Sequence, residues 1–184
     1  HSTIHASAQL AIDSDMFRNI SHLLDIGGGS GCFSTAFINR HSNSVATIFE
    51  LPEVCATLAS QIGNPQINLY SGNFLVDDFI NDCDGILLSN ILHDWNINIV
   101  KLLLEKSFRA LPSKGKLFIH EMLLNEDKCG PVTATAFNLL MYVNHGSQQF
   151  TQSELYALLE EAGFKFYNYI KTHPYYSLIV AQKE

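Results

Sequence analysis

The stretch Leu23-Leu24-Asp25-Ile26-Gly27-Gly28-Gly29-Ser30-Gly31 decides how the rest of the chain is interpreted. Apolar residues lead into an acid, and four glycines follow within five positions. This pattern predicts a short buried strand and then a turn too tight for side chains. Glycine has no Cβ, so it can adopt a positive φ and let a flat ligand lie directly on backbone N–H groups. The apolar residues that follow have helical spacing: Phe33, Ala36, Phe37 and Ile38.

The spacing of the glycines narrows the choice of ligand. The dinucleotide fingerprint G-x-G-x-x-G fits Gly27 and Gly29, but Cys32 stands where its third glycine would be, and no Gly-Lys-Ser/Thr of a phosphate loop follows. About 20 residues further on, an apolar run over 45–49 ends in Glu50, and a carboxylate at the tip of a second strand can bind both ribose hydroxyls. The pattern therefore favours an adenosine-bearing ligand without a pyrophosphate, and S-adenosylmethionine is such a ligand.

Composition excludes several classes of protein. The 184 residues are 47% hydrophobic and 16% charged, which indicates one globular domain. A net charge of −7 without a Lys/Arg cluster argues against nucleic-acid binding and against docking on an anionic membrane. No apolar run approaches the ~20 residues of a membrane span. The four cysteines are widely spaced without a C-x-x-C pair, so we expect reduced thiols of a cytoplasmic protein.

Strand and helix patterns alternate along the chain. Strands are predicted at about 22–26, 45–50, 67–70, 86–88, 116–123, 164–172 and 176–182. Helices are predicted at 4–20, up to 40 after the glycine loop, from Pro52 to 63–65, 97–111, 131–145, and from a capping box at Thr151–Glu154 to 162. This order predicts an α/β fold, a Rossmann-like doubly wound sheet of seven mostly parallel strands with an antiparallel last strand. We expect residues 1–20 to be a lead-in helix and residues 21–184 to form the domain.

Five short motifs in this order resemble the catalytic domain of the class I S-adenosylmethionine-dependent O-methyltransferases, specifically the subgroup with the caffeate, flavonoid and hydroxyindole enzymes. The motifs are Leu-Asp-Ile-Gly-Gly-Gly-Ser-Gly (24–31), Phe-Glu-Leu-Pro (49–52), Gly-Asn-Phe (72–74), Asn-Ile-Leu-His-Asp-Trp (90–95) and Ile-His-Glu (119–121). The resemblance implies S-adenosylmethionine as cofactor, S-adenosylhomocysteine as product, and a small-molecule acceptor with a phenolic or similar hydroxyl. It also implies a homodimer in the full-length form.

The resemblance assigns catalytic roles to three residues. Methyl transfer to a hydroxyl needs an aligned acceptor and a base with a pKa near neutrality, which suits His93. Glu121 is implied to bind the other imidazole nitrogen and fix the tautomer. Gln149 stands where the family has a second acid, and it adds no charge. His120 alternates with Glu121 along the strand, so we expect it to point the other way and to be structural.

A larger set is implied to bind the cofactor: Asp25, Gly27, Gly29, Glu50, Leu51, Asn73, Phe74, Ser89, Asp94 and Trp95. Asp94 is equally suited to cap the next helix. Trp95 is more often a packing residue than a contact, and core packing is the alternative to an adenine contact for Phe74. The acceptor pocket is implied at Asn138, Met141, Asn144 and His145, although an apolar stripe with Met is more often core. The histidines have no metal-ligand spacing and we find no carboxylate cluster, so we expect no metal.

Besides Gln149, two features depart from the family pattern, and three alternatives stay open. Asn73 replaces an acid of the third strand, and the family's N-terminal dimerisation domain is not among these residues. The chain begins at His1 without Met, so we expect a piece of a longer or processed protein. The alternatives are a catalytically altered S-adenosylmethionine-binding module, a C- or N-methyltransferase, and an NAD-dependent oxidoreductase. The displaced third glycine and the terminal strand pair argue against the last.

Overall fold

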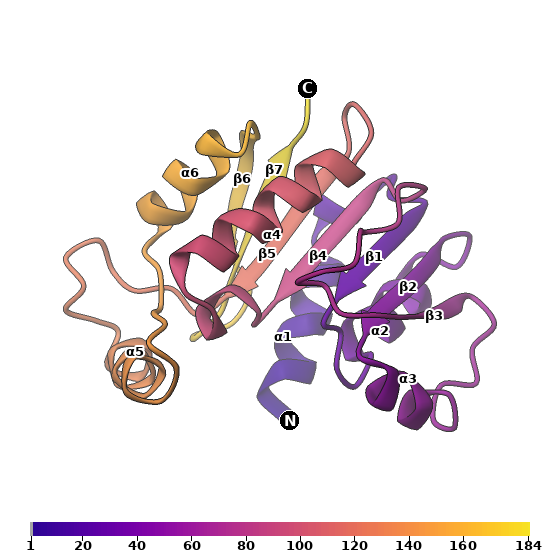
Figure 1. The fold of residues 1–184 in the computed structure, drawn as a ribbon, viewed down its shortest axis with the longest axis horizontal. Helices are drawn as coiled ribbons and strands as arrows, with labels where there is room; N and C mark the ends of the chain where they lie inside the picture. The colour runs from indigo at the N-terminus through magenta and orange to yellow at the C-terminus, as the bar shows by residue number, and fades with distance from the viewer. Residues whose placement is uncertain (1) are drawn as a thin grey trace.

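A seven-stranded sheet organises the computed structural model, which describes residues 2–184 except for the side chains of residues 2–4, 145, 166 and 167 (Figure 1). The strand order is β3-β2-β1-β4-β5-β7-β6. β7 runs antiparallel to both of its neighbours, and the other pairs are parallel. The strands are β1 His22–Ile26, β2 Val45–Glu50, β3 Ile67–Ser71, β4 Gly85–Ser89, β5 Lys116–Glu121, β6 Lys165–Lys171 and β7 Ser177–Gln182. The predicted fold class is confirmed.

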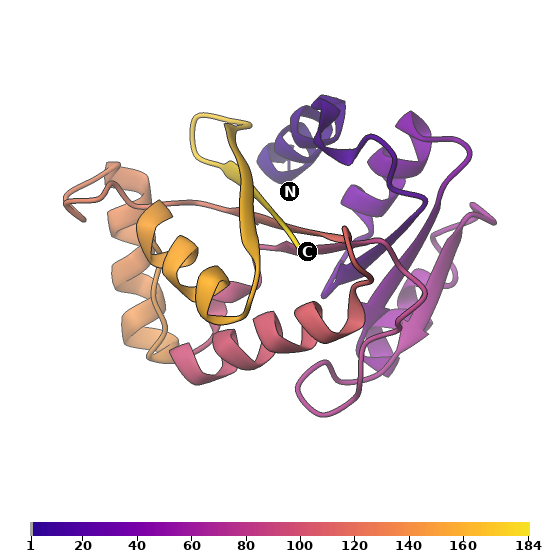
Figure 2. The same ribbon diagram turned by 90° about the horizontal axis from the view of Figure 1, so that it is seen from above.

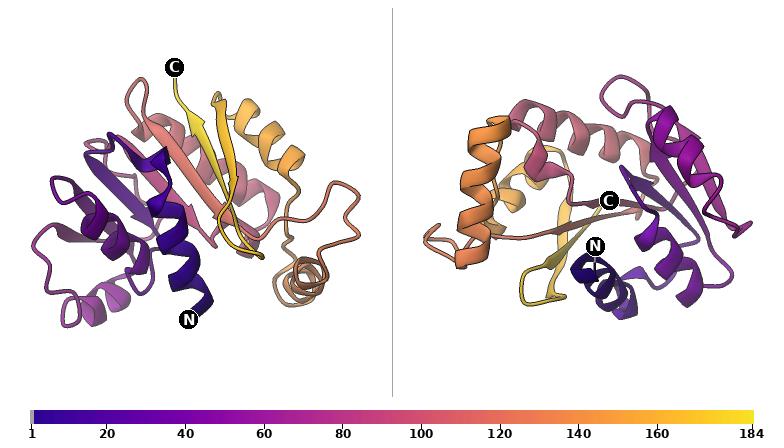
Figure 3. Two further views of the ribbon diagram at one scale, coloured as in Figure 1. Left: turned by 180° about the vertical axis from the view of Figure 1, so that it is seen from behind. Right: turned by 90° about the horizontal axis from the view of Figure 1, so that it is seen from below.

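Helices cover both faces of this sheet. They are α1 Ser2–Asp13, α2 Cys32–Arg40, α3 Pro52–Leu58, α4 Ile97–Ala110, α5 Val132–His145 and α6 Gln152–Glu161, with short 3₁₀ turns η1 Asp15–Phe17 and η2 Leu92–Asp94. Seen from above, α4 and α6 lie on one face and α1 and α2 on the other (Figure 2). Figure 3 shows α5 standing outside these layers. In the described part of the chain, no helix is both long and apolar enough to cross a bilayer.

Side-chain alternation divides the buried residues into two cores. Leu24 and Ile26 of β1 belong to the core under α4 and α6, whereas Leu23 belongs to the core under α1 and α2. In β5, Ile119 lies in the first core and Phe118 in the second. Residues at even and odd positions of a strand therefore serve different layers, as strand geometry requires.

The glycine loop between β1 and α2 has the backbone that its sequence predicts. Gly27, Gly29 and Gly31 have φ of +63°, +55° and +70°, a region that side chains disfavour. A Cβ on Gly27 would lie 2.5 Å from Cδ1 of Ile91. The alternating glycines thus allow both the turn and the close approach of the segment after β4.

Three predicted boundaries are wrong by several residues. The segment 4–20 is not one helix, because Ser14 adopts an extended backbone and its hydroxyl binds the Ala11 carbonyl. α3 ends at Leu58 rather than near 63. In the tighter turn that follows, the Ser60 hydroxyl donates to the Thr57 carbonyl. β5 ends at Glu121 because its neighbour β7 begins at the paired residue Ser177.

The α1 side of the sheet depends on one aromatic pair. Phe118 is fully buried and stacks on Phe17 of η1, with ring centroids 4.0 Å apart. We expect Phe118→Ala to lower the free energy of unfolding by about 3–5 kcal/mol, measured by urea unfolding. Val76→Ala, at a site 78% exposed, is the control and should change it by less than about 0.5 kcal/mol. A loss below about 1 kcal/mol for Phe118→Ala would contradict this account of the core.

Candidate active site

A cavity of about 260 Å³ lies at the carboxyl ends of β1 and β4. Four residues predicted to bind the cofactor line it: Asp25, Gly27, Gly29 and Ser89. The other lining residues are His5, Gly28, Ser30, Cys32, Phe33 and Asn90. Open α/β sheets usually bind their ligands at this edge, and cofactor binding by these residues stays a prediction.

Asp25 gives the cavity an acidic wall. Its side chain is 1% exposed, and the Ser34 hydroxyl donates to Oδ2 at 2.8 Å. Burial raises the pKa of Asp25 to about 6, against the lowering effect of the hydrogen bonds from Ser34, and the charge of Glu50 raises it further. A cationic group in the cavity would favour the ionised carboxylate.

Glu50 ties the glycine loop to the end of β2. Gly29 N donates to Oε1 and Leu51 N donates to Oε2, each at 3.0 Å. A carboxylate offers about four acceptor sites, so each oxygen can still accept a proton from a ribose hydroxyl. Contact between Glu50 and a ribose stays a prediction, as does the cofactor contact of Leu51, which precedes α3.

An aromatic pair lies beside the loop. The Phe74 and Trp95 rings meet edge to face with centroids 5.7 Å apart, and a Cβ on Gly27 would come within 3.7 Å of Phe74. Lys106 of α4 donates to the Phe74 carbonyl at 2.6 Å and holds this segment on the sheet. Both rings pack against the core under α4 and α6, which supports a packing role, and their contact with a cofactor stays a prediction.

Asn73 has a turn-forming role. Its Oδ1 accepts from Leu75 N at 2.9 Å, and its backbone N donates to Asp77 Oδ2 at 2.7 Å. The amide oxygen thus stabilises the turn after β3, as Asn commonly does. Contact between Asn73 and an adenosine stays a prediction.

A histidine and a glutamate form a buried pair at the ends of β4 and β5. His93 Nδ1 lies 2.5 Å from Glu121 Oε2. The other oxygen of Glu121 accepts from the backbone N of Ile91 at 3.1 Å and of Leu92 at 3.0 Å. An ionised carboxylate can only accept hydrogen bonds, so we assign the proton of neutral His93 to Nδ1, which faces Glu121. The other ring nitrogen, Nε2, then has the lone pair of a base.

The electrostatics of this pair favour a charged imidazole. Burial alone would lower the pKa of His93, but the charge and hydrogen bond of Glu121, together with the charge of Asp94, raise it above the ordinary value. The Asp94 carboxylate lies 3.4 Å from Nε2. Asp94 therefore adjoins the candidate base itself.

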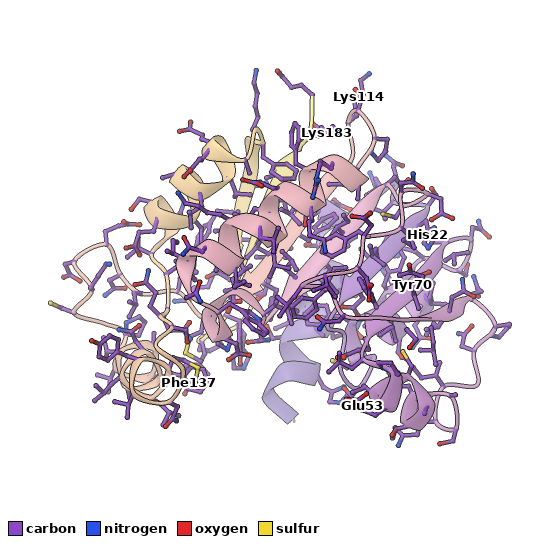
Figure 4. The ribbon with its side chains drawn as sticks, in the orientation of Figure 1. His22, Glu53, Tyr70, Lys114, Phe137 and Lys183 are labelled. Atoms are coloured by element: carbon purple, nitrogen blue, oxygen red, sulfur yellow. The ribbon has the colours of Figure 1, made fainter. Side chains whose placement is uncertain are left out.

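One face of α5 adjoins His93. The ring of Phe137, which Figure 4 labels on α5, meets the imidazole edge to face with centroids 5.5 Å apart. Met141, one turn further along α5, is 6% exposed. Asn138 accepts from Gln149 N at 2.7 Å, while Asn144 is exposed. The His145 side chain lies outside the described residues.

Gln149 is buried without side-chain partners. It is 1% exposed, and in the described part of the structure its Oε1 and Nε2 have no hydrogen-bond partner. Buried amides nearly always make hydrogen bonds, so these two atoms are available to bind a polar group of a ligand. Its action on His93 stays a prediction.

His120 points away from Glu121, as expected. Its imidazole is fully buried on the α1 side of the sheet and contacts Ser7 and Ser89. Burial lowers the pKa of His120 to about 3, so it stays neutral.

Sequence reasoning missed several residues of the site. Cys32 and Phe33 begin the helix after the loop, and Asn90 follows Ser89, so their positions were available from the pattern. Phe137 precedes Met141 by four residues, which is a signal of a shared helix face. His5 had no local signal, because α1 reaches the cavity only through tertiary packing. Among the described residues, no three His, Cys, Asp or Glu side chains gather as a metal site would require.

Comparisons with known proteins agree on one kind of relative. A family model described as the O-methyltransferase domain matches residues 1–165. The 3-hydroxy-5-methyl-1-naphthoate 3-O-methyltransferase of Streptomyces sahachiroi is 32% identical over 159 residues, covering 84% of this chain and 46% of that protein. The chain thus spans about half the length of the curated relatives it matches.

Solved structures give the same result. Human N-acetylserotonin methyltransferase in complex with SAM has a TM-score of 0.88 and 28% identity, covering 98% of this chain and 52% of that chain. An O-methyltransferase family 2 protein from Planctomyces limnophilus in complex with apigenin has a TM-score of 0.82 and 34% identity, covering 89% of this chain and 51% of that chain.

The raised pKa of Asp25 predicts how stability depends on pH. The folded protein binds this proton more tightly than the unfolded chain, so the stabilisation is complete below about pH 4 and is lost as the pH rises through about 6. Asp25→Asn has no titrating group here, so its stability relative to the native chain should change with pH. We expect its free energy of unfolding to rise relative to that of the native chain by roughly 1–3 kcal/mol between about pH 4 and pH 7. Urea unfolding at several pH values measures this difference. A difference that stays constant would show that Asp25 titrates normally.

Proposed function

This chain belongs to the O-methyltransferase domain family that matches its residues 1–165, and from that premise we propose that it transfers a methyl group from S-adenosylmethionine to a hydroxyl of a small molecule. The observation that carries the proposal is the buried contact of 2.5 Å between His93 and Glu121, near a glycine-lined cavity. The acceptor is phenolic or similar, and relatives named as O-methyltransferases support oxygen as the acceptor atom.

The residues present fit this cofactor. Bound S-adenosylmethionine supplies an electrophilic methyl group on a positively charged sulfur. Asp25 provides a carboxylate for the amino end, Gly27 and Gly29 provide bare backbone, and Glu50 provides acceptors for ribose hydroxyls. Cys32 occupies the position of the third glycine of the dinucleotide fingerprint, which disfavours the pyrophosphate of NAD. Leu51, Asn73, Phe74, Ser89, Asp94 and Trp95 complete the proposed cofactor set.

The chain's own residues then handle the acceptor proton. Glu121 accepts the Nδ1–H of His93, so Nε2, which lies 3.4 Å from the Asp94 carboxylate, carries the lone pair that takes the proton of the acceptor hydroxyl. The same carboxylate stabilises the imidazolium that forms, as in other base–carboxylate pairs. Burial of both side chains excludes water and strengthens this interaction.

α5 and the segment after it are the proposed acceptor wall. Phe137 and Met141 supply apolar surface near His93, and Asn138, Asn144 and Gln149 supply amides. Because Gln149 is neutral, the carboxylates of Glu121 and Asp94 would compensate the charge of protonated His93 without a further acid. The neutral Gln149 therefore supports a second candidate function, in which the same cofactor serves altered chemistry such as N- or C-methylation.

Assembly and location are also proposals. Leu139, Tyr142 and Val143 of α5 are large apolar residues that are mostly exposed, which supports a homodimer in the full-length form. The free cysteines support a cytoplasmic location. Residues 21–184 are the proposed catalytic domain, and α1 of the preceding residues packs against its second core.

The role of His93 predicts a loss of turnover without a loss of cofactor affinity. We expect His93→Ala to lower methyl transfer to a panel of phenols by about 10²–10⁴-fold, because a general base contributes that much. Radiolabelled methyl transfer measures the rate, and calorimetry should find S-adenosylhomocysteine affinity within about twofold of native. His41→Ala, at the C-terminal end of α2, is the control. Undiminished turnover by His93→Ala would refute the role.

The raised pKa of His93 predicts the pH profile. The base must be neutral, so kcat/KM should rise with pH around a midpoint above about 6.5. Glu121→Gln removes the charge that raises this pKa, so the midpoint should move to lower pH while the plateau falls at least about tenfold. An unchanged midpoint in this variant would show that Glu121 does not raise the pKa of the base.

A further inference from the structure

We propose that α1 forms part of the cofactor site and that His5 binds the carboxylate at the amino-acid end of S-adenosylmethionine, an inference that rests on the proposed function. α1 was expected to be only a lead-in helix. In the structure, His5 lines the same cavity as Asp25 and the glycine loop, although 20 residues separate it from Asp25 in sequence.

The charges around this cavity make His5 distinctive. Of the described residues that line the cavity, His5 is the only one whose side chain can carry a positive charge, and Asp25 is the only acid. The amino-acid end of the cofactor carries one ammonium and one carboxylate. Asp25 suits the ammonium, and the carboxylate then requires donors. An imidazole is a stronger donor to a carboxylate than the neutral groups of Ser30 and Asn90 when it is protonated.

A buried network holds α1 in this position. Ser7 Oγ lies 2.7 Å from His120 Nε2, and Ser89 Oγ lies 3.2 Å from His120 Nδ1. The Tyr176 ring stacks on the imidazole with centroids 4.9 Å apart. Because Ser89 lines the cavity and Ser7 belongs to α1, His120 joins two walls of the same site.

The inner side of α1 fixes its rotation as well. Ala8, Ala11 and Ile12 are buried against the second core, so the helix is packed as well as hydrogen-bonded. His5 is exposed near the N-terminal end of this helix, where a ligand can reach it. His120 and Ser7 are therefore positioning residues, and His5 is the contact residue.

Three ligands separate a carboxylate contact from other effects. S-adenosylhomocysteine has both amino-acid charges, its decarboxylated analogue has only the ammonium, and methylthioadenosine has neither. We expect His5→Ala to weaken binding of S-adenosylhomocysteine by about 10-fold or more in calorimetry, which is the range of a hydrogen bond to a charged group. Binding of the other two ligands should stay within about twofold. His5→Gln, which keeps a donor, should recover part of the loss.

The positioning residues have a second test. We expect Ser7→Ala to show the same dependence on the ligand carboxylate, at about 3- to 10-fold, together with faster amide hydrogen exchange in α1. A merely structural role would weaken all three ligands equally. Gln9→Ala, an exposed change on the same helix outside the cavity, is the matched control and should alter neither readout.

The outcomes distinguish this inference from the proposed function. If the native chain binds S-adenosylhomocysteine and His5→Ala weakens all three ligands equally, or none of them, the inference is wrong and the proposed function stands. If the native chain binds none of the three adenosine ligands, the proposed function fails and the inference fails with it.

Discussion

The carboxylate of Glu121 is the constraint on which the catalytic part of the structure depends. One oxygen receives two backbone N–H groups of the segment that leads into η2, and the other receives the imidazole of His93. A buried carboxylate is unfavourable unless such donors surround it. The same contacts that stabilise the charge therefore fix the turn, the tautomer and the raised pKa of the histidine.

The cofactor cavity has a comparable logic around Asp25. Strand β1 ends in a buried acid, and the glycine loop leaves no side chain above it except at Ser30. Burial raises the pKa of Asp25 to about 6, so its carboxylate is mostly ionised at neutral pH in an environment that disfavours the charge, and a bound cation would stabilise it. Glu50 holds the loop from the next strand.

Much of this arrangement follows from local sequence, and the remainder depends on long-range packing. The glycine loop, the capping box at Thr151 and the opposite orientations of His120 and Glu121 follow from backbone sterics and strand periodicity. The contact of His5 with the cavity could not be predicted, because it depends on how α1 packs on a strand more than 100 residues away. Nor does a local pattern show that the amide of Gln149 is buried without a hydrogen-bond partner among the described residues.

Nitrogen NMR of isotope-labelled histidine rings tests the central claim most directly, with His93 assigned by comparison with His93→Gln. The account predicts that neutral His93 carries its proton on Nδ1 and titrates above the ordinary histidine pKa, because Glu121 holds that nitrogen. A proton on Nε2, or a pKa at or below the ordinary value, would contradict it.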